Sequence, residues 1–538
     1  MRAAALIDNA MAGLQAAQAG ILVTSQNVAG ASVEGYVRRT AQPRITALAA
    51  NSMELTGTAF AVEGFTRQFN QLLQGQLLSQ QAKTAYTDAL TQSVGVLDAL
   101  LVEPASSIAA AMSTFFNAAG SLANEPSNPA YQQAVIGSAR QVADRIRGLA
   151  GEVDRIEDNA RQALADALNQ ANVLAPQLAA VNAKIRGAQN PGHWYPSADL
   201  LDERDRLTQQ LQSLVGGSTI INEDGTASVL IAGQHLVDRE KHHLFTNLSG
   251  TTPVRDDQDL VDLRLKVSTS PGQPTTLIPL IQEATQQKNA DGSPKEDSNG
   301  NSMMMPGVSA FQDGQAGAYV HLLNSFAPSM QKSLSLLGVS LVRQVNGIKN
   351  AAGQTIAPIF GFESTVAGGS DLSSATDARV SALFDDPASA QDYSFEALFE
   401  GSNPQSANYR KGIDQKLSAP DFDARLFKVV GTFDTTQFTK VDATASRAME
   451  GLRDDFSSPV TVIITSVATT IAAWRSDHVA NEAIQKSLSD QKEAASGVSL
   501  DEEAANLVKY QQLYNASSKL IQSGQQMFDT LLAMLSGR

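Results

Sequence analysis

The sequence predicts a mainly α-helical protein with a β-rich insertion, and three observations support this fold class. Apolar residues recur every seven positions at both ends of the chain, which is the spacing of helices that wrap around partner helices. Apolar residues at helical spacings also dominate residues 70–214 and the chain from residue 443 onward. After Gly216 and Gly217, short β-branched segments flank an Asp-Gly turn, which is typical of antiparallel strands.

The N-terminal pattern belongs to a helix that we expect over residues 3–29, with Gly30 as its C-terminal stop. Its larger members are seven apart and are Ile7, Leu14, Ile21 and Val28. Smaller residues interleave with them at the three- and four-residue spacing, namely Ala10, Ala17 and Thr24.

The C-terminal pattern follows a strong helix-start signal, because Ser499 and Glu502 have the spacing of a capping box. Its larger members are Leu500, Leu507, Tyr514, Ile521, Phe528 and Leu535. The interleaved residues are Tyr510, Ser517, Gly524 and Leu531. We expect the two terminal helices to form a coiled-coil pair and to pack against partner helices.

Three domains follow from these boundaries. Residues 1–40 and 476–538 are expected to form the terminal helical coiled-coil domain. Residues 41–214 and 306–475 should form a mainly helical bundle domain, with an irregular segment near 355–440. Residues 215–305 should form an outer β-rich domain, in which strands are predicted at 218–222, 227–231 and 260–267. Further helices are expected over 154–186 and 316–350, and short strands over 427–433.

The composition excludes several classes of partner. A net charge of −15 argues against nucleic acid and against an anionic membrane surface. The chain has no cysteine, which removes disulfides, thiolate metal sites and cysteine nucleophiles. No cleaved signal peptide is recognised, and no stretch of about 18 or more apolar residues exists; the nearest candidate, Val460–Trp474, is short and rich in threonine. We expect neither a nucleic-acid nor a membrane partner.

A cluster of carboxylates could form a metal or acid–base site, but two arginines lie among these carboxylates in the sequence. Asp202 and Arg206 are four residues apart on a predicted helix, which favours a salt-bridged helix end. The carboxylates are Asp199, Asp202, Glu203 and Asp205, and the arginines are Arg204 and Arg206.

No other motif points to catalysis. His242 and His243 are adjacent but lack the spacing of an HExxH zinc motif, so a solvated pair is expected. Phosphate-binding GxxxxGK[ST] and nucleophile-elbow GxSxG motifs are absent. We therefore predict no enzyme activity and no catalytic, cofactor-binding or metal-binding residue.

Both ends of the chain resemble the FlgK family, the first flagellar hook-associated proteins, which join hook to filament. The stretch Ser499–Tyr514 and the segment Met527–Leu532 are similar to that family's ending. Residues 25–38 resemble its segment after the first helix, which usually reads Asn-Ile-Ala-Asn and then Thr-Pro-Gly-Tyr. Here Gly30 replaces an asparagine, and Val33–Glu34 replace Thr-Pro.

Interior segments favour this family over hook and rod proteins, which share only the ends. Residues 199–207 resemble its Asp-Leu-Leu-Asp-x-Arg-Asp signature, which is followed by a strand hairpin at 222–225. Phe115–Phe116 with Pro126 and Pro129, and Val345–Asn346, are similar to further family motifs.

The resemblance implies a structural subunit of the bacterial flagellum, assembled in a ring after export through the flagellar type III pathway. Its implied partners are the hook protein, the second junction protein (hook-associated protein 3) and an export chaperone on the C-terminal helix. The implied location is extracellular, at the hook–filament junction. The residues expected at the assembly interface are Ile7, Leu14, Ile21, Val28, Leu500, Leu507, Tyr510, Tyr514, Ile521, Phe528, Leu531 and Leu535.

Three alternatives remain open at this point. The chain could be another axial protein, of the hook or rod type. It could be an enzyme such as a peptidoglycan hydrolase carried on a flagellar scaffold, which would need a paired carboxylate site in a cleft. It could also be a chaperone or adhesin with a coiled-coil stalk, which would form small defined oligomers in solution.

Overall fold

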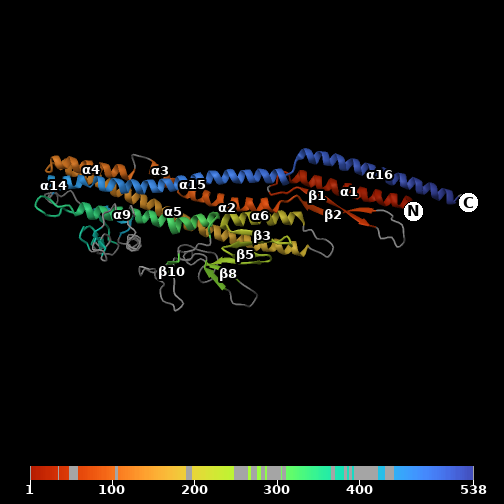
Figure 1. The fold of residues 1–538 in the computed structure, drawn as a ribbon, viewed down its shortest axis with the longest axis horizontal. Coiled ribbons are helices and arrows are strands. Elements are labelled where there is room, and N and C mark those ends of the chain that lie inside the picture. Colours follow the sequence, from red (N-terminus) through yellow and green to blue (C-terminus); the bar gives the residue numbers. More distant parts are fainter. Residues whose placement is uncertain are drawn as a thin grey trace.

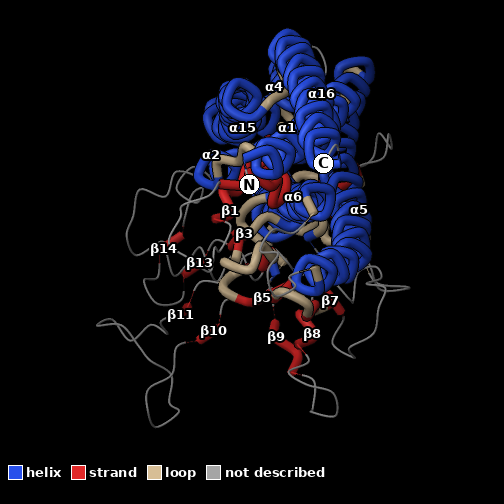
Figure 2. Tube along the Cα trace, turned by 90° about the vertical axis from the view of Figure 1, so that its right-hand side faces the viewer, coloured by secondary structure: helices blue, strands red, loops and turns tan. Residues whose placement is uncertain are grey.

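The structure is a computed structural model that shows an elongated helical rod with both termini at one end (Figure 1). Small sheets and loops lie along one side of the rod (Figure 2). The residues that it describes are 2–33, 35–47, 58–102, 107–188, 197–246, 264–267, 276–279, 285–286, 304–305, 311–364, 370–377, 379–380, 385–386, 391–392, 422–430 and 441–536.

Long helices build the rod, which confirms the mainly α-helical fold class. The helices are α1 (Arg2–Gly30), α2 (Gln71–Ser93), α3 (Gly95–Val102), α4 (Ile108–Asn124), α5 (Pro129–Gly187), α6 (Ala198–Val215), α8 (Gly314–His321), the π-helix η2 (Leu322–Phe326), α9 (Ala327–Asn346), the 3-10 helix η4 (Ala424–Leu426), α14 (Ala443–Gly451), α15 (Arg453–Ser496) and α16 (Leu500–Ser536).

The strands pair only with antiparallel neighbours in the described part of the chain. A four-stranded sheet has the order β3-β4-β5-β6, a three-stranded sheet has the order β7-β8-β9, and two-stranded sheets pair β1 with β2, β10 with β11, β12 with β15, and β13 with β14. The strands are β1 (Arg39–Ala47), β2 (Thr58–Arg67), β3 (Ser218–Ile221), β4 (Ala227–Ile231), β5 (Gln234–Asp238), β6 (Lys241–His242), β7 (Leu244–Thr246), β8 (Arg264–Val267), β9 (Thr276–Pro279), β10 (Thr285–Gln286), β11 (Met304–Met305), β12 (Phe360–Phe362), β13 (Asp385–Asp386), β14 (Gln391–Asp392) and β15 (Phe427–Val429).

Two hydrophobic cores lie along α5, which is 59 residues long and contributes to both. The larger core joins α4, the first half of α5, α9, α14 and α15 around Phe115, Phe116, Phe360 and Phe427. The smaller core joins the second half of α5 to α6, α8 and the β3–β7 strands. Tyr319 packs against both cores, so the body of the molecule is continuous.

Helix α15 runs along the body and contributes one apolar face to the larger core. That face consists of Phe456, Val460, Ile463, Val467, Ile471 and Trp474. By length and composition alone, one window within Ala443–Thr530 reaches a mean hydropathy of 1.5, enough for a membrane span. A core helix of a soluble protein passes the same test, and this face is used in the core.

Four helical asparagines in the described part of the chain hold strand residues by both backbone groups. The side-chain amide accepts from the N–H and donates to the C=O of the same residue, which satisfies both groups away from water. The pairs are Asn27 with Arg39, Asn172 with Phe245, Asn182 with Ala227, and Asn346 with Phe360. Asn27 and Asn346 belong to the family-like motifs of the sequence, and this contact gives both a structural role.

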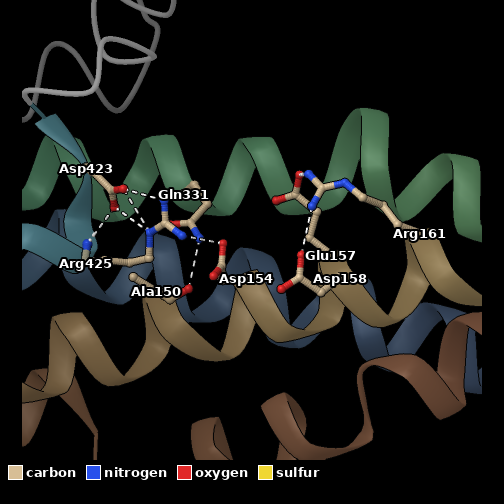
Figure 3. A network of polar contacts seen from close by, with 8 residues as sticks. All are labelled: Ala150, Asp154, Glu157, Asp158, Arg161, Gln331, Asp423 and Arg425. Atoms are coloured by element: carbon tan, nitrogen blue, oxygen red, sulfur yellow. Dashed lines mark hydrogen bonds and ion pairs between the residues drawn. The ribbon is translucent and has the colours of Figure 1, made fainter. Parts of the chain in front are cut away.

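A polar network attaches the segment before β15 to α5 (Figure 3). Arg425 contacts Asp423 in its own segment and Asp154 of α5, with an Nη1 to Oδ1 distance of 2.7 Å. Gln331 of α9 donates to the carbonyl of Ala150 at 2.9 Å. The Arg425 contacts hold the segment before β15 against α5, and the Gln331 contact joins α9 to α5.

Two elements were not expected from the sequence. The hairpin of β1 and β2 covers much of 39–67, and its register shifts between Gln42 and Pro43. A π-helix also interrupts the helix expected over 316–350, between α8 and α9. The predicted hairpin of 218–222 and 227–231 is confirmed by β3 and β4, and the strand predicted at 260–267 is described only from Arg264. Residues 289–301 and most of 381–421 lie outside the described part.

Candidate assembly interface

The terminal helices α1 and α16 form an antiparallel pair at one end of the rod (Figure 1). Three close approaches fix their register. A Cβ atom on Gly13 would lie 2.6 Å from Ser517 Oγ, and one on Gly20 would lie 2.4 Å from the ring of Tyr510. A Cβ atom on Gly524 would lie 2.8 Å from Ile7. Glycine therefore permits close backbone contact at three levels of the pair.

The line of contact between the two helices consists mainly of small residues. On α1 the buried residues of this line are Ala10, Ala17, Gly20, Thr24 and Asn27, and on α16 they are Glu503, Ser517 and Gly524. Most of these are the interleaved residues of the two heptad patterns. The sequence expectation that the two terminal helices pair is confirmed, but the smaller residues make the contact.

The larger heptad residues remain at the edge of the pair. Ile7, Leu14, Ile21, Leu507 and Ile521 are only partly buried. Tyr510, an interleaved residue, is also partly buried, and its ring lies against Gly20 in the line of contact. Val28 is 47% exposed, Tyr514 37%, Phe528 53% and Leu500 57%. The side chains of Leu531 and Leu535 lie outside the described residues. The pair by itself thus leaves most of the predicted interface residues in contact with solvent.

These larger residues share one side of the pair. Most of them lie four positions after a residue of the contact line, as Leu14 follows Ala10 and Tyr514 follows Tyr510. In an antiparallel pair, equal offsets from the line of contact fall on the same side. The register brings Leu14 level with the turn of Tyr514, and Ile21 level with the turn of Leu507. We call this side the large apolar face.

A second row of exposed apolar residues follows the other flank of α16. Leu513, Leu520 and Met527 lie three positions after the contact-line residues and are 40%, 47% and 44% exposed. Exposed apolar side chains at this spacing are typical of an interaction surface.

The start of α16 is held by Arg38. Ser499 caps the helix, because its Oγ accepts from the N–H of Glu502 at 3.4 Å. The Glu502 carboxylate, which the expected capping box would direct back to the helix start, instead pairs with Arg38 Nη1 at 2.7 Å. Arg38 Nε also donates to Glu503 at 2.9 Å, and the Glu503 side chain is 2% exposed.

The α6 carboxylates of the 199–207 segment, which resembles the family signature, bind the β1–β2 hairpin. Arg39 contacts Asp199 and Asp202, at 2.5 and 2.9 Å from its Nη2. Arg67, the register partner of Arg39 in the hairpin, contacts Asp202 and Asp205 at 2.9 and 2.7 Å. This cluster is a structural ionic link, as expected.

The expected pairing within α6 needs correction. Arg206 pairs with Glu203 at 2.6 Å, whereas Asp202 points to the hairpin arginines. Burial raises the pKa of Asp202 above its usual value, and the nearby guanidinium of Arg67 acts against that rise. Burial also lowers the pKa of Lys492 of α15, which is close to Asp205 and Arg67.

Sequence reasoning missed the residues that position the pair. Arg38, Arg39 and Arg67 were not singled out, although the two adjacent arginines that follow the first helix after a short turn were a visible signal. Gly13 and Gly20, seven residues apart, were a second signal for a close helix contact. Gly30 belongs to the same region: a Cβ atom there would lie 2.5 Å from the Tyr36 ring, so glycine makes room for Tyr36.

No group of metal-ligating residues appears in the part of the chain that the structure describes. Three or more His, Cys, Asp or Glu residues nowhere gather there in a way that could hold a metal ion. An open groove of about 970 Å³ between α2 and α15 is lined by Leu72, Ile484 and Leu488, with Lys83 as its one charged lining residue. This groove lacks the paired carboxylates that a glycosidase needs.

Comparisons with known proteins point to one family. Residues 94–357 match the family model described as the flagellar hook-associated protein FlgK helical domain. Residues 492–534 match the model of the flagellar basal body rod FlgEFG protein C-terminal region. The first match spans α3 to α9, and the second spans the end of α15 and most of α16.

Curated relatives carry the same name across distant bacteria. Flagellar hook-associated protein 1 of Salmonella typhimurium is 23% identical, over 98% of this chain and 99% of the relative. The Escherichia coli protein of that name is 29% identical over 42% of each chain. The Bacillus subtilis protein is 24% identical over 45% of this chain and 50% of the relative. A solved structure of the flagellar hook junction protein FlgK from Burkholderia pseudomallei is 21% identical, with a TM-score of 0.40, and covers 54% of this chain and 47% of that one.

Proposed function

Since the chain belongs to the FlgK family of flagellar hook-associated proteins, we propose that it joins hook to filament as a structural subunit of the bacterial flagellum. The match to the FlgK helical domain distinguishes it from hook and rod proteins, with which it shares the C-terminal helix. Its role is to present packing surfaces, and no catalytic role is proposed.

One observation carries the assembly part of the proposal. The α1–α16 pair buries small residues between its helices and leaves Leu500, Tyr514 and Phe528 in solvent. Apolar side chains of this size are stabilised when other helices cover them, at about 1.5–3 kcal/mol for full burial of each. The large apolar face therefore packs against the same helices of neighbouring copies, in a ring.

The proposed partners follow from the place of the subunit in the flagellum. The hook protein lies below the ring, and hook-associated protein 3 lies above it. Before secretion an export chaperone covers α16, because an exposed apolar face invites aggregation in the cytosol. The chain then leaves the cell by the flagellar type III pathway and functions outside it.

The domain boundaries remain part of the proposal. Residues 1–40 and 476–538 form the inner domain, with the β1–β2 hairpin beside it. Residues 41–214 and 306–475 form the helical body, and residues 215–305 form the outer β-rich domain. The ionic link between the hairpin and α6 connects the inner domain to the body.

A C-terminal deletion tests this function. The chain without residues 504–538 is expressed in cells that lack their own copy of the gene, next to cells that receive the full chain at the same level. The truncated chain should leave no junction, so filament subunits should appear in the medium and filaments should be missing by electron microscopy. Normal filaments on the deletion strain would overturn the proposal.

A further inference from the structure

We propose that the dipeptide Arg38–Arg39 is a two-sided clamp that fixes the direction in which the α1–α16 pair leaves the body of the rod. It lies between four helices that meet at this point, namely α1, α6, α15 and α16. Each residue uses both its backbone and its side chain, and the two residues hold different helices.

Arg38 holds the junction of α15 and α16. Its backbone N–H donates to the carbonyl of Ser496, the last residue of α15, at 3.0 Å. Its guanidinium binds Glu502 and Glu503 in the first turn of α16. One residue thus contacts both sides of the break between these helices.

Arg39 holds α1 and α6. Its backbone N–H and C=O bind the amide of Asn27 in α1, at 3.0 and 2.9 Å. Its guanidinium binds Asp199 and Asp202 of α6. Arg67 reinforces this side through Asp202 and Asp205.

The opposite directions of the two side chains follow from the backbone. Arg38 and Arg39 lead into strand β1, and successive side chains of an extended chain point to opposite faces. The side chains that hold α16 and α6 are therefore adjacent in sequence. Arg39 and Arg67 are 7% and 4% exposed and Asp202 is 16% exposed, so the ion pairs with Asp202 are screened less than surface pairs, whereas Asp199 is 78% exposed.

Little else joins the helix pair to the body. Among the described elements, α16 packs extensively only on α1, and α1 packs on α16 and the hairpin. The covalent link between α15 and α16 passes through Gly497, where the backbone leaves the helical conformation. A link of this kind sets no direction by itself, so the clamp must supply it.

The direction matters because α16 is a long lever. Its 37 residues extend about 55 Å. A swing of roughly 10° at its base would displace its tip by about 10 Å, which is the distance between the axes of two packed helices. A clamp that prevents such a swing presents the large apolar face to neighbours in one orientation.

Distance measurements on the isolated full-length chain test the clamp. Because the chain has no cysteine, spin labels can be placed at Gln177→Cys on α5 and Gln522→Cys on α16, both of which are exposed. Position 522 lies about 33 Å along α16 from its start, so a swing of roughly 10° would move the label by about 6 Å. The unaltered chain should give a narrow distance distribution by double electron–electron resonance.

Arg38→Gln and Arg39→Gln should each broaden that distribution by about 6 Å or more. Arg206→Gln is the matched control, because Arg206 is exposed and binds only within α6, so its distribution should stay narrow. The double variant Glu502→Gln, Glu503→Gln removes the two carboxylates that Arg38 binds and keeps both arginines. It should broaden the distance distribution too.

Far-UV circular dichroism and the melting temperature of each labelled chain show whether the body remains folded. The proposal would be overturned if the body stays folded in all of the clamp variants and their distance distributions are as narrow as that of the unaltered chain. This test needs no other flagellar protein, so its outcome is independent of the function proposed above.

Discussion

Gly20 of α1 and Tyr510 of α16 are in such close contact that a Cβ atom on Gly20 would lie 2.4 Å from the tyrosine ring. The large aromatic side chain lies directly against the backbone of α1. Two helices can pack with their backbones this close only where one of them carries small residues at the contact. The pair is therefore sensitive to side-chain size on α1.

Gly20→Leu should separate α1 from α16, because leucine is a good helix former and only its size conflicts with Tyr510. Hydrogen–deuterium exchange of residues 500–536 should become faster in this variant. Gly148→Leu is the matched control, since Gly148 lies in α5 with open space around it. Unchanged exchange in α16 with Gly20→Leu would contradict the close pairing.

Asn346→Ala should destabilise the body by about 3 kcal/mol or more, because it leaves several buried backbone groups without partners. The Asn346 side chain binds the N–H of Ile359 and both backbone groups of Phe360, as well as the carbonyl of Ser373. Urea unfolding measures the loss. The exposed Asn124→Ala should change the free energy of unfolding by no more than about 0.5 kcal/mol, and equal effects for the two variants would contradict this role.

His321 should make the stability of the body depend on pH. Burial lowers the pKa of His321 below its ordinary value of 6.5, next to the hydroxyl of Tyr86 at 2.9 Å and the ring of Trp474. The unfolded chain then binds a proton more readily than the folded chain. The free energy of unfolding should therefore fall as the pH drops below about 6.5, until the lowered folded-state pKa is passed.

This dependence is measured by urea unfolding at about pH 7.5 and about pH 5, in the unaltered chain and in His321→Gln. The other histidines remain in both chains, so the difference isolates His321. The unaltered chain should lose more stability than the variant between the two pH values. An equal loss in both would mean that His321 does not carry this dependence.

Much of the helical fold was visible in the sequence, because long periodic patterns specify helices strongly. The helix expected over 3–29 is α1, and Ser499 begins the C-terminal helix as expected. The Asp224–Gly225 turn was also recognisable, since Gly225 has a φ of 76° that favours glycine.

The hairpin β1–β2 was missed for a physical reason. Its first strand reads Arg-Thr-Ala-Gln-Pro-Arg-Ile-Thr-Ala, without the alternation of apolar and polar residues that predicts a half-buried strand. Pro43 sits where the register shifts, and proline in a strand is typical of such irregularities. Contacts of Arg39 and Arg67 with α6, more than 130 residues away, are set by the tertiary fold.

The residues of the two terminal helices were visible in the sequence, but which of them the helix pair buries was not. The heptads identified large and small residues on each helix, yet periodicity alone does not say which set faces the partner. Gly13, Gly20 and Gly524 decide this, because they allow the small residues to meet and leave the larger ones outside.

Ile21→Asp should block assembly and lower the stability of the isolated pair only modestly, because Ile21 is partly buried at its edge. A charge at this position would be desolvated without a partner once a neighbouring copy covers it. Swimming of cells that carry the variant measures assembly. Gln15→Asp is the control, because Gln15 is exposed on the side of α1 that faces away from α16 and from the large apolar face, and its effect is expected to be milder. Full motility with Ile21→Asp would count against this face.

Packing of the large apolar face against neighbouring copies is tested most directly by Phe528→Asp, with Gln526→Asp as its control on the same helix. Both positions are exposed in the isolated chain, so neither change should alter the melting temperature of the monomer. Phe528→Asp should abolish filaments and release filament subunits into the medium, whereas Gln526→Asp should assemble normally. Normal filaments with Phe528→Asp, or a loss of several kcal/mol of monomer stability typical of a buried core position, would contradict packing between subunits.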